Sequence, residues 1–170
     1  MKNFEITAVE NGNKYWISRA MAVCAIVVVY DDNGIPHLLI NKRGPGTPDY
    51  QGCWNIPCGY LDWDETTSEA CTREILEECK VYIDPSKWVQ YGEIEDSINS
   101  NRQNVTIRKI VKLEWDEWCK ALKDAISMNT DGGEENEVDD IKLLPLSAYH
   151  IMNINWAFNH KKLAYDIMLH

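Results

Sequence analysis

The segment from Ala20 to Tyr30 constrains the fold of this chain more than any other stretch of its sequence. It is rich in Val, Ile and Ala and shows little alternation with polar residues. This pattern is typical of a strand that is covered on both faces. We therefore expect a central strand inside a layered domain. The run is far shorter than the roughly 20 apolar residues that a membrane-spanning helix needs.

The residues that follow this strand predict a hairpin. Asp31–Gly34 contains an Asn-Gly pair, which favours a tight turn, and Pro36–Lys42 resumes a strand-like pattern. Arg43 then lies where the second strand ends. Gly44–Pro48 has the composition of a loop, and the short apolar stretch Cys53–Ile56 stops at the next proline.

Further strands and helices alternate along the rest of the chain. This interleaving predicts a single α/β domain that spans residues 1–170. The elements we expect are strands at Trp88–Glu95 and Val105–Trp115 joined by the polar segment Ser97–Asn104, a helix at Asp116–Met128, an acidic loop at Asn129–Asn136, a strand at Ile141–Leu144 and a helix at Trp156–Leu169.

The charge balance limits the class of partner. The chain has 27 acidic and 17 basic residues and a net charge of -10. Such a surface repels long nucleic acids and anionic membranes unless a local basic patch overrides it. A small phosphate compound that carries a metal ion remains compatible, because the metal and a few local cations reverse the field inside a cleft.

The N-terminus and the cysteines indicate a cytoplasmic protein. Met1–Glu5 lacks the apolar core of a signal peptide. The six cysteines show no Cys-x-x-Cys spacing, so zinc-ribbon and thioredoxin-like sites have no support in the sequence. We expect reduced thiols that mostly pack as small apolar groups.

The chemistry-bearing segment begins with a clear helix start. Thr66 and Glu69 have the spacing of a capping box, which predicts a helix from about Thr67 to Cys79. On a helical wheel Glu74, Glu77 and Glu78 fall within an arc of about 100°. Carboxylates this close repel one another unless a cation lies between them, and hard oxygen ligands suit Mg²⁺ or Mn²⁺. A solvated acidic helix face is the competing interpretation.

The spacing of the wider segment decides between these interpretations. Gly59–Val81 resembles the signature of the Nudix hydrolases, which reads Gly, five residues, Glu, seven residues, then Arg-Glu-aliphatic-x-Glu-Glu-x-Gly-aliphatic. Eight of the nine specified positions match, namely Gly59, Glu65, Arg73, Glu74, Ile75, Glu77, Glu78 and Val81.

Two positions depart from the family pattern. Lys80 replaces a glycine where the helix should end, at a position that usually favours a left-handed residue. We expect a cost of about 1 kcal/mol in helix capping and no effect on the metal ligands. Cys58 replaces the first glycine of the family's Trp-x-aliphatic-Pro-Gly-Gly lead-in, which concerns the backbone turn before Gly59.

The resemblance implies a fold and a set of roles. The fold is the Nudix-type α/β/α sandwich with a mixed central sheet. Glu74, Glu77 and Glu78 would bind Mg²⁺ or Mn²⁺, and the Gly59 carbonyl would complete the ligand set. Arg73 would orient Glu74 with support from Glu65, although a plain ion pair with helix neighbours also explains an arginine there.

Two further residues are candidates outside the signature. Arg43 would contact substrate phosphate, because relatives are often basic at the matching position, although a surface location is the alternative. The general base is either a signature glutamate or an acid on a later loop, where Glu134, Glu135 and Glu137 are available. We favour Glu137.

The implied activity is metal-dependent hydrolysis of a diphosphate linkage in ADP-ribose, a nucleotide sugar or a nucleoside triphosphate. Two alternatives stay open. One is a non-catalytic module that senses nucleotide sugars or ADP-ribose, although such relatives usually lose signature glutamates. The other is a diphosphate isomerase with a catalytic cysteine at Cys53 or Cys58. Trp54 and Trp63 are not assigned to a nucleobase. Relatives often form homodimers, so a homodimer is possible.

Overall fold

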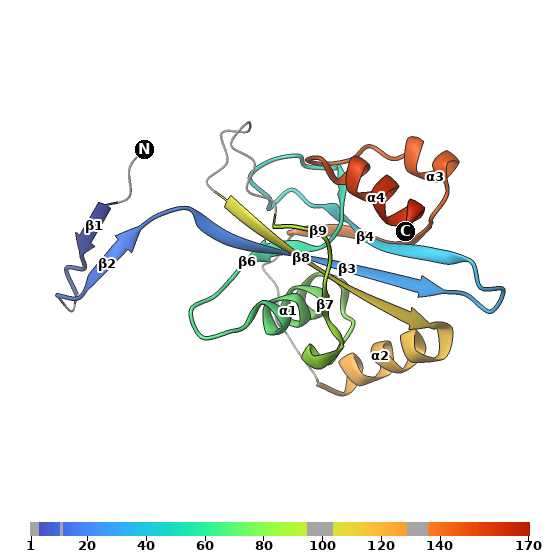
Figure 1. Cartoon of the computed structure of the whole chain (residues 1–170), viewed down its shortest axis with the longest axis horizontal. Helices are drawn as coiled ribbons and strands as arrows, with labels where there is room; N and C mark the ends of the chain where they lie inside the picture. The colour runs from blue at the N-terminus through green and yellow to red at the C-terminus, as the bar shows by residue number, and fades with distance from the viewer. Residues whose placement is uncertain (1–3, 11, 95–103, 129–135) are drawn as a thin grey trace.

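A computed structural model describes residues 4–10, 12–94, 104–128 and 136–170. It contains two sheets and four α-helices in these ranges (Figure 1). The strands are β1 (Phe4–Thr7), β2 (Lys14–Ile17), β3 (Ala20–Tyr30), β4 (Pro36–Arg43), β5 (Trp54–Asn55), β6 (Cys58–Tyr60), β7 (Val89–Gln90), β8 (Asn104–Glu114) and β9 (Val138–Pro145). The helices are α1 (Thr67–Cys79), α2 (Trp115–Met128), α3 (Ala148–Met152) and α4 (His160–Leu169), with a short 3₁₀ turn, η1 (Pro85–Lys87).

Strand β3 is the centre of the main sheet, as its apolar sequence predicted. It pairs in parallel with β8 along its whole length, from Ala20 opposite Asn104 to Tyr30 opposite Glu114. Its other edge pairs antiparallel with β4 at one end and with β6 at the other. Strands β5 and β9 both extend the sheet from β4. The sheet is therefore mixed, as expected.

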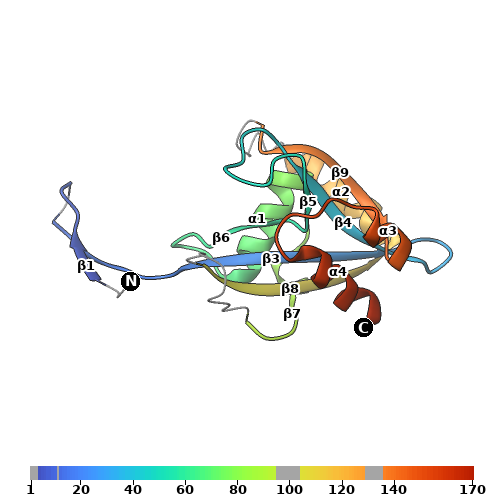
Figure 2. The same ribbon diagram turned by 90° about the horizontal axis from the view of Figure 1, so that it is seen from above.

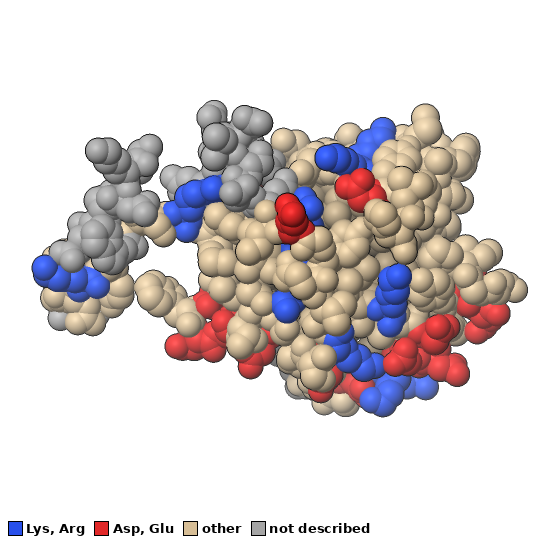
Figure 3. All heavy atoms as spheres, in the orientation of Figure 1, with Lys and Arg blue, Asp and Glu red and all other residues tan. Residues whose placement is uncertain are grey.

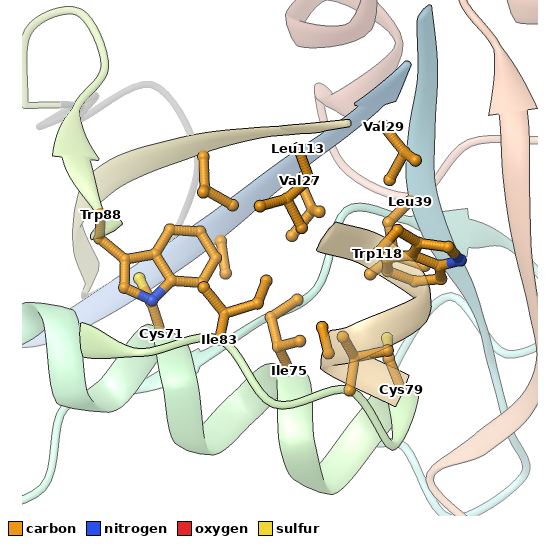
Figure 4. Packing of buried hydrophobic residues seen from close by; sticks show 14 of the residues in the cluster. Val27, Val29, Leu39, Cys71, Ile75, Cys79, Ile83, Trp88, Leu113 and Trp118 are labelled. Atoms are coloured by element: carbon orange, nitrogen blue, oxygen red, sulfur yellow. The ribbon is translucent and has the colours of Figure 1, made fainter. Parts of the chain in front are cut away.

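Two layers of helices cover the two faces of this sheet (Figures 1 and 2). Alternate residues of β3 point to opposite sides: Val27 belongs to the cluster with α1 and α2, and Ile26 to the cluster with α3 and α4. In Figure 4 the side chains of Cys71 and Ile75 rise from α1 toward the strands. The predicted α/β/α sandwich is confirmed, because both faces of β3 are covered from Ala22 to Val29.

Helix α1 begins as the capping box predicted. The Thr66 hydroxyl accepts a hydrogen bond from the Glu69 backbone N–H, and the Glu69 carboxylate accepts one from the Thr66 N–H. The helix ends at Lys80, which has φ 55° and ψ 43°, and the Lys80 N–H donates to the Leu76 carbonyl. The left-handed residue is therefore present although its usual glycine is not.

We expect Lys80→Gly to stabilise the protein. Glycine adopts this left-handed conformation without a Cβ penalty, and part of that gain is offset by greater freedom of the unfolded chain. The net gain should be about 0.5–1 kcal/mol, which thermal melting would detect as a rise of a few degrees. The control is Lys123→Gly inside α2, which should lose about 1 kcal/mol. An unchanged or lower melting temperature for Lys80→Gly would contradict this prediction.

Two of the expected elements are shorter in the structure. The helix expected at Trp156–Leu169 begins only at His160. Trp156 instead bridges to Trp54, the Ala157 N–H donates to the Trp54 carbonyl, and Phe158 has a positive φ of 55°. These pairings hold the backbone in a non-helical course.

The strand expected at Trp88–Glu95 is reduced to the two residues of β7, which pair at the edge of β8. Gly92, with φ 62°, follows this short pairing. Glu95 lies outside the described residues, as do most of the polar segment Ser97–Asn104 and of the acidic loop Asn129–Asn136.

Strands β1 and β2 form a separate antiparallel hairpin that sequence analysis did not predict. Figures 1 and 2 both show it standing away from the sandwich, at the start of β3. The Tyr15 ring meets the exposed Trp63 ring edge-on at 5.8 Å between centroids, which links the hairpin to the loop before α1. None of the helices in the described ranges has the length and apolar character needed to span a membrane.

Candidate active site

Gly59 and Glu74 approach each other closely in the candidate site. Strand β6 holds Gly59 beside β3, opposite Val23, and α1 carries Glu74 past it. A Cβ atom built on Gly59 would overlap the Glu74 carboxylate. Any side chain at this position would therefore displace Glu74, so the glycine is explained by close approach.

Arg73 links four groups of this segment. Its Nε and Nη2 atoms donate to the two oxygens of Glu65 at 3.0 and 2.7 Å. Its Nη1 atom donates to Glu74 at 2.7 Å and to Glu77 at 3.2 Å, and Nη2 also donates to the Tyr60 carbonyl at 2.9 Å. These bonds raise the Arg73 pKa, chiefly through Glu65, and they lower the pKa of Glu65. The guanidinium thus ties the loop before α1 to two carboxylates of the helix.

Glu74 is buried, so the interpretation of α1 as a solvated acidic face is wrong at this residue. Only 7% of Glu74 is exposed. Burial raises the pKa of its carboxyl, and the charge and hydrogen bond of Arg73 oppose that shift. A carboxylate held in this way keeps its charge only because a cation lies next to it.

The surroundings of Glu78 disfavour its charged form. Burial raises its pKa to about 8, and repulsion from Glu74 and Glu137 adds to the shift. A hydrogen bond from Asn41 and the charge of Arg43 act in the opposite direction. Glu74 and Glu137 are therefore close enough to repel Glu78, and a bound cation would relieve this repulsion.

Glu137 is held near this group by backbone contacts. The Gly44 N–H donates to the Glu137 carbonyl at 2.7 Å, and the Gly46 N–H donates to the Asn136 carbonyl at 2.9 Å. A Cβ atom on Gly44 would overlap the Asn136 carbonyl. The loop after β4 and the start of β9 are therefore in direct contact. Glu134 and Glu135, the other two candidate acids, lie outside the described residues.

Arg43 lies at the edge of the same region. Its Nη2 and Nε atoms donate to the Asp49 carboxylate at 2.8 Å and the Asp49 carbonyl at 2.9 Å. Its guanidinium carbon lies 5.0 Å from the centre of the Phe158 ring. The side chain is 12% exposed, so it is not a plain surface residue. Its positive charge acts to lower the pKa of both Glu78 and Cys58.

The acidic residues fit a divalent metal by their chemistry, without a ready-made site. In the described part of the chain, no three His, Cys, Asp or Glu side chains converge closely enough to hold an ion. Glu74 and Glu77 instead share Arg73. The donors are nevertheless hard oxygens, and burial raises the pKa values of Glu74 and Glu78, with repulsion from neighbouring carboxylates adding to the shift. A cation would have to draw these carboxylates together.

The structure also brings in residues that sequence analysis did not select. Asn41 contacts Glu78, Asp49 pairs with Arg43, and the Tyr60 carbonyl accepts from Arg73. A polar residue directly after the apolar run Leu38–Ile40 was the one available signal for Asn41. Nothing in the spacing of Asp49 or Tyr60 indicated their contacts.

Three other residues near the site, Cys58, Trp54 and His160, have surroundings that indicate a structural role. Burial raises the Cys58 pKa to about 12, so its thiol is a poor nucleophile near neutral pH. Trp54 packs against the cluster beneath α4, with the Lys142 ammonium 3.8 Å from its ring centre. His160 is buried and accepts a hydrogen bond from the Ile56 N–H.

The mixed sandwich and the glutamate-rich helix packed against Gly59 define an α/β protein of the class that the signature implied. Comparison with known families agrees: residues 20–167 match the NUDIX domain, and the chain belongs to this family.

Solved structures support the same fold. The NUDIX domain of NrtR from Shewanella oneidensis, complexed with ADP ribose, has 19% sequence identity and a TM-score of 0.64 over 91% of this chain and 90% of that chain. NrtR from the same organism, complexed with a 27mer DNA, has 20% identity and a TM-score of 0.59 over 85% of this chain and 58% of that chain.

A third structure carries an explicit enzyme name. It is a bifunctional NMN adenylyltransferase/ADP ribose pyrophosphatase from Francisella tularensis, complexed with AMP and a Mn ion. It has 19% identity and a TM-score of 0.63 over 89% of this chain and 41% of that chain. At these identities the likeness concerns the fold.

Proposed function

We propose that this chain is a divalent-metal-dependent pyrophosphohydrolase that cleaves a diphosphate linkage in a nucleoside diphosphate derivative of the ADP-ribose or nucleotide-sugar type, or in a nucleoside triphosphate. The observation that carries this proposal is the arrangement around Arg73, which gathers Glu65, Glu74 and Glu77 while Gly59 admits the Glu74 carboxylate. The matching family supports the reaction class.

The proposed roles follow from the contacts. Glu74, Glu77 and Glu78, with the Gly59 carbonyl, would hold Mg²⁺ or Mn²⁺. Such an ion, when bound, would neutralise charge at the phosphoryl oxygens and make a water molecule more acidic. Arg73 keeps Glu74 charged and oriented, because its guanidinium donates to that carboxylate at 2.7 Å.

Two more side chains complete the proposed mechanism. Arg43 binds a phosphate of the substrate. Its guanidinium would release the Asp49 carboxylate and pair with the phosphate instead. Glu137 accepts the proton of the attacking water as the general base. One phosphorus–oxygen bond forms to the water and the bridging bond breaks, so that two phosphate-bearing products leave.

A sensing module is the second candidate, and one observation favours it. The described residues do not converge on a ready cation site. The NrtR domain from Shewanella oneidensis, which has the same fold, was solved with ADP ribose. Against this candidate, all the signature glutamates are present here.

On the face shown in Figure 3 the described Lys and Arg residues are scattered rather than joined in one basic band, and the net charge is -10. We therefore do not propose long nucleic acid as a partner.

We further propose that residues 1–170 form one Nudix hydrolase domain in the cytoplasm. The family match begins at residue 20, so the β1–β2 hairpin would be an N-terminal extension of that domain. All six cysteines are present as thiols, which suits a reducing compartment.

The deciding experiment is a substrate panel with Mg²⁺, and then with EDTA. The panel contains ADP-ribose, dinucleoside polyphosphates, nucleotide sugars, NADH and nucleoside triphosphates. We expect metal-dependent cleavage within one class, with a nucleoside monophosphate among the products. Binding of one compound with no turnover in any metal would favour the sensing module instead.

We expect metal binding to depend on pH through Glu78. Its pKa is raised from 4.5 to about 8 in the folded chain. Below pH 4.5 the group is protonated in both states and contributes no pH dependence. As pH rises from about 4.5 to about 8, the unfolded chain loses this proton first, so the stability of the metal-free protein falls.

A cation at Glu78 displaces the same proton, so the apparent affinity for Mn²⁺ should rise by up to about tenfold per pH unit until about pH 8. Thermal melts with and without metal at pH 6 and pH 8 provide the measurement. The metal-induced rise in melting temperature should be larger at pH 8. An equal rise at both pH values, or a larger one at pH 6, would contradict the prediction.

A further inference from the structure

Asn41 is a buried polar residue of strand β4. It lies on β4 directly after Leu39 and Ile40, both fully buried, and is itself only 2% exposed. Its Nδ2 atom donates a hydrogen bond to Oε2 of Glu78 at 3.0 Å. This bond joins the sheet to the acidic side of α1, across 37 positions of the chain.

The Asn41 amide is satisfied at one end only. Among the described residues, no group donates to its Oδ1 atom. Buried polar groups are normally paired, and an unpaired one carries a desolvation cost. The end of Asn41 that is satisfied is the end that faces Glu78.

The direction of this bond restricts what Glu78 can do. An amide nitrogen only donates and an ionised carboxylate only accepts, so the Nδ2 atom faces Glu78 whenever this carboxylate is charged, as it is when it binds a cation. The bond retains Oε2 against the sheet and fixes the rotation of the carboxylate. The other oxygen, Oε1, then remains available for a second interaction. Groups that hold a metal ligand in this way typically change metal affinity by about 10–100-fold when they are removed.

Asn55 provides an internal comparison for this contact. It lies opposite Asn41 in the β4–β5 pairing, is 1% exposed, and its Oδ1 atom likewise has no donor among the described residues. Its Nδ2 atom, however, donates to the Ile56 carbonyl at 2.9 Å and to the Cys58 sulfur at 3.8 Å. The two asparagines therefore share strand pairing and burial, whereas the bond to Glu78 belongs to Asn41.

We infer that Asn41 is a positioning residue that orients the Glu78 carboxylate for binding a divalent cation. This inference rests on the proposed function, since it assigns Asn41 a role through a metal ligand of that site. It makes the sheet, and not only the signature helix, part of the metal-binding arrangement.

The test measures Mn²⁺ binding to the full chain without substrate, by electron paramagnetic resonance of the free ion and by calorimetry. The variants are Asn41→Leu, Asn55→Leu, Glu78→Gln and the double variant Asn41→Leu/Glu78→Gln. We expect Asn41→Leu to weaken Mn²⁺ binding by about 10–100-fold. Asn55→Leu removes no bond to Glu78, so its Mn²⁺ affinity should stay within about threefold of the parent. This should hold even if Asn55→Leu lowers the melting temperature as much as Asn41→Leu does.

The double variant decides whether Asn41 acts through Glu78. With Glu78 already replaced, Asn41→Leu should weaken Mn²⁺ binding by no more than about twofold further, because the residue it positions is gone. If Asn41→Leu does not fold, Asn41→Ser replaces it, since the shorter side chain cannot reach Glu78. Fully additive losses, equal losses for Asn41 and Asn55, or unchanged affinity in the Asn41 variants would overturn the inference. Unchanged Mn²⁺ binding in Glu78→Gln would instead overturn the metal site itself.

Discussion

Replacing Glu78 by glutamine is expected to lower turnover by at least about 100-fold while leaving the fold intact. Glutamine keeps the shape of the side chain and can still meet Asn41, which lies 3.0 Å from the Glu78 carboxylate. It removes the negative charge that we propose binds the cation, and losses of a single electrostatic contribution of this kind are about 10²–10³-fold. Initial rates with the best substrate of the panel, at saturating Mg²⁺, are the measurement.

The stability of this variant should move in the opposite direction. Burial and the repulsion of Glu74 and Glu137 raise the pKa of Glu78 to about 8, so a neutral side chain removes an unfavourable charge. The metal-free variant should therefore melt at or above the parent temperature near pH 8, and added Mg²⁺ should shift it little. Full turnover at saturating Mg²⁺ would exclude Glu78 from the metal ligands.

Replacing Arg73 by glutamine is the second change with a large expected effect. It removes the paired bonds to Glu65 and the bonds to Glu74, Glu77 and the Tyr60 carbonyl. Glu74, which is 7% exposed, would then lack its charged partner. We expect a loss of about 1–3 kcal/mol in the free energy of unfolding, since Arg73 is partly exposed and water screens part of the change. Turnover should fall by about 10–100-fold.

The matched control for this variant is Lys120→Gln. Lys120 forms an exposed pair with Asp124 on α2 at 3.0 Å, and such pairs contribute roughly 0.3–0.5 kcal/mol. Urea unfolding at constant pH compares the two variants. If Arg73→Gln costs no more than Lys120→Gln, the arginine is only a surface ion pair, which is the simpler interpretation that its helix neighbours allow.

Local interactions explain why some elements could be predicted well. The Thr66–Glu69 capping box and the apolar run Ala20–Tyr30 predicted α1 and β3 with the bounds that the structure has. Both depend on residues that are close in the sequence. The Asn33-Gly34 turn and the following strand were predicted for the same reason, and Gly34 has the positive φ, 74°, that such a turn requires.

Elements that depend on distant partners were predicted poorly. The β1–β2 hairpin and the three-residue β6 have no clear pattern of their own, and β6 exists through its pairing with β3. The start of α4 was misplaced because Ala157 bonds to Trp54, far away in the sequence. Secondary structure that is stabilised by long-range pairing leaves little trace in a local pattern.

The sequence by itself determined the family signature, the helix that carries it and the central strand, because spacing and apolar patterns act over a few residues. Only the tertiary structure decided the surroundings of those carboxylates. It buried Glu74 against Gly59, set Asn41 beside Glu78 and brought the charge of Glu137 within reach of Glu78. Burial and charge repulsion depend on which strands pack around α1, and no local pattern of residues contains that information.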